Sequence, residues 1–114
     1  MTCHILVVDD EPLSRRNIAR FLERAGHKIR EADTGEAAID LIRPHDFTTV
    51  ISDLRLPGEI NGLDVLKHQN QTNPGKRLIL ITGFGSDEVQ SAAKQLGAIY
   101  LEKPLSMLGL LSYL

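Results

Sequence analysis

The chain has 114 residues, and its 13 lysines and arginines against 15 aspartates and glutamates give a formal net charge of −2. This length suits one domain with a single hydrophobic core, without further domains in these residues. The near balance of charge excludes a general attraction to nucleic acid or to an anionic membrane, so we expect no direct nucleic-acid binding and recognition of partners through local surfaces.

Cysteine and histidine usage argues against disulfide and zinc chemistry. Cys3 has no partner for an internal disulfide and begins an apolar run, which fits a packing role in a reducing compartment. No hydrophobic run is long enough to cross a bilayer and no charged leader precedes the first apolar run, so we expect a cytoplasmic protein with no membrane segment. The histidines lack metal-ligand spacing; they are His4, His27, His45 and His68.

The first 26 residues predict one strand followed by one helix. Residues 5–8 form a continuous apolar run, as in a strand buried on both faces. Pro12 suits the first turn of a helix, where no backbone donor is needed. An apolar stripe with the spacing i, i+3, i+4 and i+7 begins at Ile18, and Gly26 ends this helix.

The next two units repeat the alternation of strand and helix. Residues 27–32 are half polar, as in an edge strand, and Asp33 offers a helix cap with a glutamate three positions later. The helix that follows is expected to end near Pro44. Residues 49–51 predict a buried strand that places Asp53 at its end, and a loop then leads to a helix from about Gly62.

The last third of the chain predicts two more strands and two more helices. Residues 78–81 form the fourth strand, and Ser86 or Asp87 caps the helix that Gly97 ends. Residues 98–101 form the fifth strand, and residues 105–114 form a brief helix. Strands that alternate with helices predict an α/β fold, a five-stranded parallel sheet covered by helices on both faces.

Polar residues follow four of the five predicted strands. Asp9 and Asp10 follow the first strand, Asp53 the third, Thr82 the fourth and Lys103 the fifth. Ligands of such sheets bind beyond the carboxyl ends of the strands, where the winding direction reverses, so we expect these side chains to meet. Asp53 alone would be better explained as the start of a turn, and only the other strand ends favour a functional role.

The chemistry of this set favours phosphoryl transfer to a carboxylate. Three adjacent carboxylates repel one another unless a cation intervenes, and Mg²⁺ is commonly bound by one or two carboxylates together with phosphate oxygens. A lysine and a hydroxyl beside the metal would contact the remaining phosphoryl oxygens. Asp53 is the predicted nucleophile.

The same residues closely resemble the receiver domain of two-component response regulators. The motifs that carry the resemblance are Asp9-Asp10, Asp53-Leu54-Arg55-Leu56-Pro57, Thr82-Gly83 and Tyr100-Leu101-Glu102-Lys103-Pro104. They occur in the family's order and extend over nearly the whole chain. The resemblance implies a flavodoxin-like, CheY-like sheet with the strand order 2-1-3-4-5. It also implies that residues 1–114 are one receiver domain with no effector domain among them.

The resemblance also implies how the acidic residues act. Asp53 would accept a phosphoryl group from a phosphohistidine on a sensor histidine kinase or a phosphotransfer protein. Asp10 would bind Mg²⁺ directly and Asp9 largely through water, while the backbone carbonyl of Arg55 would complete the protein ligands. The chain would then be a signalling domain rather than an enzyme, with self-catalysed phosphotransfer and slow autodephosphorylation.

Three further residues would convert phosphorylation into a change of surface. The resemblance implies that Thr82 hydrogen-bonds the new phosphoryl oxygens, that Lys103 pairs with them, and that Tyr100 rotates inward behind Thr82. The output would be a homodimer or effector contact through the fourth helix, fifth strand and fifth helix. Taken singly, these residues are better explained as a helix cap, a solvated charge and a half-buried strand aromatic, and it is their joint occurrence at the strand ends that favours the functional roles.

Other functions use related chemistry. A degenerate receiver would bind partners without phosphorylation, but such domains usually lose part of the acidic cluster or the lysine. Phosphatases with an aspartate nucleophile typically place a second acid two residues later, where this chain has Arg55. A flavin-binding domain needs a phosphate-binding loop after its first strand, where residues 9–11 would repel phosphate.

Three features depart from the family pattern or extend it. The loop after Pro57 takes five residues to reach Gly62, where the family usually takes four. Arg55 and Phe84 are bulky at positions that flank the path of the hydrolytic water, so we predict that they influence the lifetime of the phosphorylated state. Residues 105–114 are apolar on more than one face, which suggests packing against another copy or a C-terminal continuation.

Overall fold

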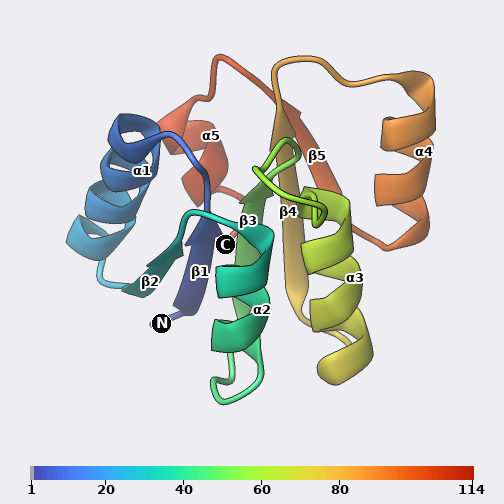
Figure 1. The fold of residues 1–114 in the computed structure, drawn as a ribbon. Helices are drawn as coiled ribbons and strands as arrows, with labels where there is room; N and C mark the ends of the chain where they lie inside the picture. The colour runs from blue at the N-terminus through green and yellow to red at the C-terminus, as the bar shows by residue number, and fades with distance from the viewer. Residues whose placement is uncertain (1) are drawn as a thin grey trace.

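The computed structural model describes residues 2–114, and in this range five strands alternate with five helices (Figure 1). The strands are β1 (His4–Val8), β2 (Lys28–Ala32), β3 (Thr49–Asp53), β4 (Arg77–Thr82) and β5 (Ile99–Glu102). The helices are α1 (Pro12–Arg24), α2 (Gly35–Ile42), α3 (Gly62–Thr72), α4 (Asp87–Gln95) and α5 (Met107–Leu111). All strand pairs are parallel and the order is β2-β1-β3-β4-β5, which confirms the predicted α/β fold and strand order.

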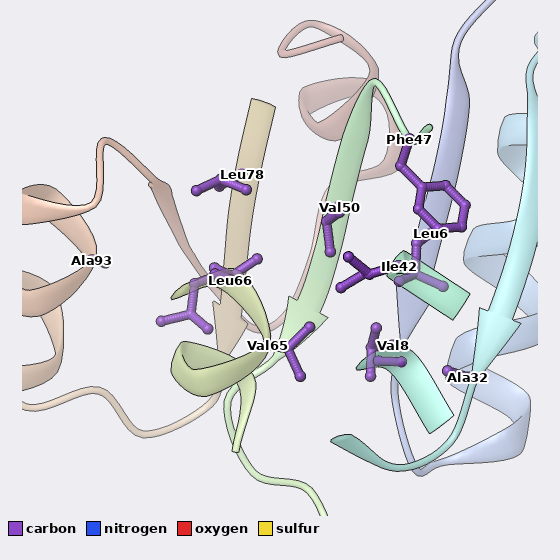
Figure 2. Packing of buried hydrophobic residues seen from close by; sticks show 12 residues of the cluster. Leu6, Val8, Ala32, Ile42, Phe47, Val50, Val65, Leu66, Leu78 and Ala93 are labelled. Carbon is purple, nitrogen blue, oxygen red and sulfur yellow. The ribbon is translucent and has the colours of Figure 1, made fainter. Parts of the chain in front are cut away.

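Each face of the sheet has its own hydrophobic cluster. On one face, side chains of the sheet pack against α2, α3 and α4; Figure 2 shows Val8 and Val50 of this cluster near Ile42 and Val65 of the helices. On the other face, α1 and α5 cover the sheet, and Leu110 of α5 is fully buried there. The alternation along each strand explains this division, because successive side chains of a strand point to opposite faces.

The register of the sheet brings the ends of the central strands level with one another. Asp53 at the end of β3 is paired with Ile81, one residue before the end of β4. Thr82, the last residue of β4, is paired with Glu102 of β5. The residues that follow β1, β3, β4 and β5 therefore emerge along one edge of the molecule.

Helix ends follow the predicted signals with one correction. Glu11 caps α1, and Ser86 caps α4. The cap of α2 is Thr34 and not Asp33: the Thr34 side chain accepts a hydrogen bond from the backbone N–H of Ala37 at 3.0 Å. Both residue types cap helices well, and the choice depends on which side chain meets the free N–H groups of the first turn.

Most apolar residues of the C-terminal segment, residues 105–114, pack inside the molecule. Besides the buried Leu110, four of its apolar residues pack against the cluster beneath α1 and α5: Leu105, Met107, Leu111 and Leu114. Leu108 and Tyr113 remain exposed, at 76 % and 38 %. Over residues 2–114, the structure has no helix with the length and apolar character needed to span a membrane.

Candidate functional site

Three carboxylates meet at the edge of the sheet. Asp9 and Asp10 follow β1 and Asp53 ends β3, and one carboxylate oxygen from each lies within 4.8 Å of the others. Asp9 is buried and Asp10 is exposed, while the Asp53 side chain keeps 12 % of its surface accessible. The cluster is thus open to solvent on the side of Asp10 and closed on the side of Asp9.

Lys103 supplies the positive charge of the site. Its Nζ atom donates a hydrogen bond to Oδ2 of Asp53 at 3.2 Å, and its side chain is 38 % exposed. Its backbone N–H donates to the carbonyl of Thr82 at 3.0 Å, which ties the end of β5 to the end of β4. The amine therefore reaches Asp53 from a backbone position that is itself fixed.

The electrostatics of Asp53 are dominated by its burial. Desolvation raises the pKa of Asp53, and the negative charges of Asp9 and Asp10 raise it further. The hydrogen bond and the charge of Lys103 lower this pKa, but the net direction is upward. The ionised cluster is short of positive charge, so a bound cation would favour its charged form.

Asp9 is held by contacts with its own neighbourhood. Its Oδ1 atom accepts a hydrogen bond from the backbone N–H of Glu11 at 3.0 Å. Arg15 donates to the backbone carbonyl of Asp9 at 2.9 Å and pairs with Glu31 at 3.0 Å. One oxygen of the Asp9 carboxylate is thus already engaged, unlike those of the exposed Asp10.

The start of α3 lies directly against the backbone of Asp53. A Cβ atom on Gly62 would overlap the carbonyl oxygen of Asp53 and lie 2.8 Å from its carbonyl carbon. The N–H of Gly62 donates to the carbonyl of Leu54 at 2.8 Å. The loop from Pro57 to Gly62 turns at Gly58, where φ is +88°, and its Ile60 packs into the first cluster. The longer loop is therefore accommodated and Gly62 still abuts Asp53.

Thr82 and Tyr100 lie next to each other in the sheet but make different contacts. Thr82 is buried, and its Oγ1 atom accepts a hydrogen bond from the backbone N–H of Phe84 at 3.1 Å. Tyr100 is paired with Leu80 and packs against the cluster beneath α2, α3 and α4. Its hydroxyl oxygen is buried and has no hydrogen-bond partner. Tyr100 therefore already points inward.

Two features of the site were not anticipated from the sequence. A cavity of about 360 Å³ opens beside Asp53 and Lys103 and is lined on the α1 side by Leu13, among other residues. The only sequence signal for this cavity is Leu13, a leucine that lies outside the apolar stripe of α1. In the structure Leu13 is exposed. The guanidinium of Arg55 also lies over the ring of Phe84, 5.8 Å from its centre, so the two residues predicted to influence the phosphorylated state contact each other.

Comparison with known proteins assigns the family. The family model of the response regulator receiver domain matches residues 5–114. The chain belongs to the response regulator receiver domain family. Phosphorylation of an aspartate and use of Mg²⁺ are general features of this receiver family in two-component systems.

Two curated relatives of this receiver are named as transcriptional regulatory proteins. FixJ of Bradyrhizobium diazoefficiens is 32 % identical over 102 residues, which cover 89 % of this chain and 49 % of FixJ. CusR of Escherichia coli is 31 % identical over 109 residues, which cover 95 % of this chain and 48 % of CusR. The receiver thus spans about half the length of these relatives.

Solved structures share the fold closely. A response regulator from Burkholderia pseudomallei, solved with a phosphorylated aspartic acid, calcium ion and citrate, superposes with a TM-score of 0.90 at 30 % identity. The match covers 98 % of this receiver and 66 % of that chain. A CheY-like receiver from Methanospirillum hungatei gives a TM-score of 0.92 at 27 % identity, covering 98 % of this receiver and 90 % of that chain.

Proposed function

We propose that this receiver accepts a phosphoryl group on Asp53 from a phosphohistidine of a sensor histidine kinase or phosphotransfer protein. The observation that carries the proposal is the meeting of three carboxylates within 4.8 Å with the Lys103 amine 3.2 Å from Asp53. This arrangement has the parts that phosphoryl transfer to a carboxylate needs: a nucleophile, oxygen ligands for a metal, and a cation for the phosphoryl oxygens.

The donor set fits Mg²⁺, because all of its side-chain ligands are carboxylate oxygens. Asp10 and Asp53 would bind the ion directly, and the backbone carbonyl of Arg55 would complete the protein ligands. Asp9 would act through water, because one of its oxygens already accepts the Glu11 N–H. Bound Mg²⁺ supplies charge neutralisation for the carboxylates and for the incoming phosphoryl group.

In the transfer step, an Asp53 carboxylate oxygen forms the new bond to phosphorus as the bond from phosphorus to the donor's histidine nitrogen breaks. Lys103, whose amine already contacts Asp53, would pair with an oxygen of the transferred phosphoryl group. The low exposure of Asp53 limits the access of bulk water to the acyl phosphate. Hydrolysis of the product would therefore be slow, as expected of a signalling domain.

The signal would leave through Thr82 and Tyr100. The Thr82 hydroxyl would hydrogen-bond a phosphoryl oxygen, and the position of Tyr100 would change the surface formed by α4, β5 and α5. This surface would contact an effector or a second copy, and nothing in the proposal requires nucleic-acid binding by residues 1–114.

We propose that these residues are one receiver domain without an effector domain of their own. It would act in the cytoplasm, where Cys3 stays reduced.

The proposal is tested by incubation of the wild type with acetyl phosphate and Mg²⁺, followed by intact-mass measurement. We expect the mass of one phosphoryl group to be added to the wild type, but not to Asp53→Asn and not to the wild type in EDTA. Asp10→Asn should need more Mg²⁺ for the same yield. No added mass, with a competent histidine kinase also tested, would favour the alternative of a phosphorylation-independent binding module.

A further inference from the structure

The contact between Gly85 and Tyr100 lies outside the acidic cluster and links the two parts of the proposed switch. The hydroxyl of Tyr100 in β5 lies against the segment between β4 and α4, where its oxygen is buried and has no hydrogen-bond partner. A Cβ atom on Gly85 would overlap this oxygen and would lie 2.5 Å from Cζ and 3.1 Å from Cε1 of the ring. The inward place of Tyr100 therefore exists only because residue 85 has no side chain.

The backbone of Gly85 does not explain why glycine stands there. Its φ is not in the positive region, unlike that of Gly26 or Gly97, so an L residue could adopt its conformation. Nor is the loop tight throughout, because a Cβ on Gly83, two residues earlier, would meet nothing within 4 Å. The demand for glycine at position 85 comes from the Tyr100 side chain.

The same loop is attached to Thr82. The Thr82 Oγ1 atom accepts the N–H of Phe84, the residue before Gly85, at 3.1 Å. A displacement of the Thr82 hydroxyl toward Asp53 would pull on this hydrogen bond and shift the backbone that covers Tyr100. The chain of contacts runs from Thr82 through Phe84 and Gly85 to Tyr100.

We infer that Gly85 is a positioning residue: it sets whether Tyr100 can lie inward and thereby whether the proposed switch from Thr82 to Tyr100 can operate. The coupling to phosphorylation rests on the proposed function. The placement of Tyr100 does not, because it is a property of the unphosphorylated chain. A side chain at position 85 turns Tyr100 out onto the surface of β5.

The test uses tyrosine fluorescence, which this chain reports cleanly because it has no tryptophan and two tyrosines. In a Tyr113→Phe background, Tyr100 is the only tyrosine. Quenching by acrylamide is measured for this protein, for Gly85→Ala and for the matched control Gly83→Ala. We expect Tyr100 to lose its protection in Gly85→Ala and to keep it in Gly83→Ala, with circular dichroism unchanged in both.

A second variant covers the case in which Gly85→Ala keeps Tyr100 inward by straining the fold. The midpoint of thermal unfolding, Tm, would then fall by about 5–10 °C, as expected for overpacking. The same substitution in a Tyr100→Leu background should leave Tm nearly unchanged, because the ring is gone. The inference is overturned if Tyr100 stays protected at an unchanged Tm, if Tyr100→Leu does not rescue the loss, or if Gly83→Ala behaves like Gly85→Ala.

Phosphorylation separates this inference from the proposed function. Gly85→Ala leaves the acidic cluster intact, so acetyl phosphate should still add one phosphoryl group. In the wild type the added group should change the quenching of Tyr100, and in Gly85→Ala it should not. Failure of the wild type to gain mass would contradict the proposed function, while the quenching of the unphosphorylated proteins would still decide the role of Gly85.

Discussion

At the scale of single residues, the site is built from a carboxylate that is costly to ionise. Asp53 is largely buried next to two other acids, and one lysine compensates only in part. Because the pKa of Asp53 is raised in the folded chain, the folded state binds this proton more tightly than the unfolded state does. The charge of Asp53 therefore costs stability above its folded pKa, and the cost vanishes below its ordinary pKa.

Asp53→Asn should accordingly stabilise the metal-free protein at pH 7, because the amide removes a charge that the fold accommodates poorly. The gain should shrink as the pH falls through the folded pKa of Asp53 and disappear below about pH 4. Urea unfolding of both proteins in EDTA over this range measures it. Equal stability at pH 7, or a gain that grows toward acid, would contradict the assigned electrostatics.

Arg55 and Phe84 belong to the same scale. Phe84 is 80 % exposed and lies under the Arg55 guanidinium, and the two residues follow Thr82 and Asp53 by two positions each. Arg55→Ala and Phe84→Ala should each speed dephosphorylation by about threefold to tenfold, or roughly 0.7–1.4 kcal/mol of barrier. Leu108→Ala, at an exposed residue of α5, is the control. Unchanged rates in both variants would show that the pair does not affect the hydrolytic water.

At the scale of elements, the contact between the start of α3 and the end of β3 fixes Asp53. The sequence indicated Gly62 as the start of this helix, and the longer loop before it made the geometry uncertain. In the structure this loop turns at Gly58, where φ is +88°, and Gly62 abuts the Asp53 backbone. Backbone touching backbone leaves no flexible group that could yield to a side chain.

Gly62→Ala should therefore destabilise the fold by about 1–3 kcal/mol, because β3 and α3 must separate to admit the methyl group. It should also reduce phosphorylation of the remaining folded protein, since Asp53 shifts with its backbone. Gly83→Ala, with open space at its Cβ position, should stay within about 0.5 kcal/mol of the wild type. Chemical denaturation gives both values, and similar losses in the two variants would rule out the steric cause.

The elements themselves were predictable, because apolar runs and capping residues are local signals. All five strands and five helices were expected close to where the structure has them within residues 2–114. The cap of α2 was missed because Asp33 and Thr34 both suit it chemically. The inward position of Tyr100 could not be predicted from residues near it in the sequence, since it depends on Gly85 in the loop between β4 and α4.

At the scale of the whole molecule, the strand order brings the ends of β1, β3, β4 and β5 to one edge, and this could be predicted from alternation and resemblance. The cavity beside Asp53 could not, because it depends on how α1 and the segment after β5 pack over the sheet. The apolar C-terminal segment is likewise explained only in three dimensions. Most of its apolar residues pack into the hydrophobic cluster on the face of the sheet that α1 and α5 cover, and only Leu108 and Tyr113 are left exposed.

This exposed pair gives the prediction for assembly. We expect the receiver to self-associate through α5 when a beryllofluoride mimic of the phosphoryl group is bound, and Leu108→Asp to prevent it, because a charge there would be buried in the contact. Gln71→Asp is the control, since Gln71 is exposed on α3 and does not line the cavity beside Asp53. Light scattering with and without the mimic measures the mass. A monodisperse monomer in both conditions would count against self-association.

The central claim is that Asp53, and no other acid of the cluster, carries the phosphoryl group. Borohydride converts an aspartyl phosphate into homoserine, so reduction after treatment with acetyl phosphate and Mg²⁺, followed by peptide mass spectrometry, identifies the residue. We predict homoserine at position 53 in the wild type and at no position in EDTA. Homoserine at Asp9 or Asp10, or modification that persists in Asp53→Asn at the wild-type yield, would contradict the account.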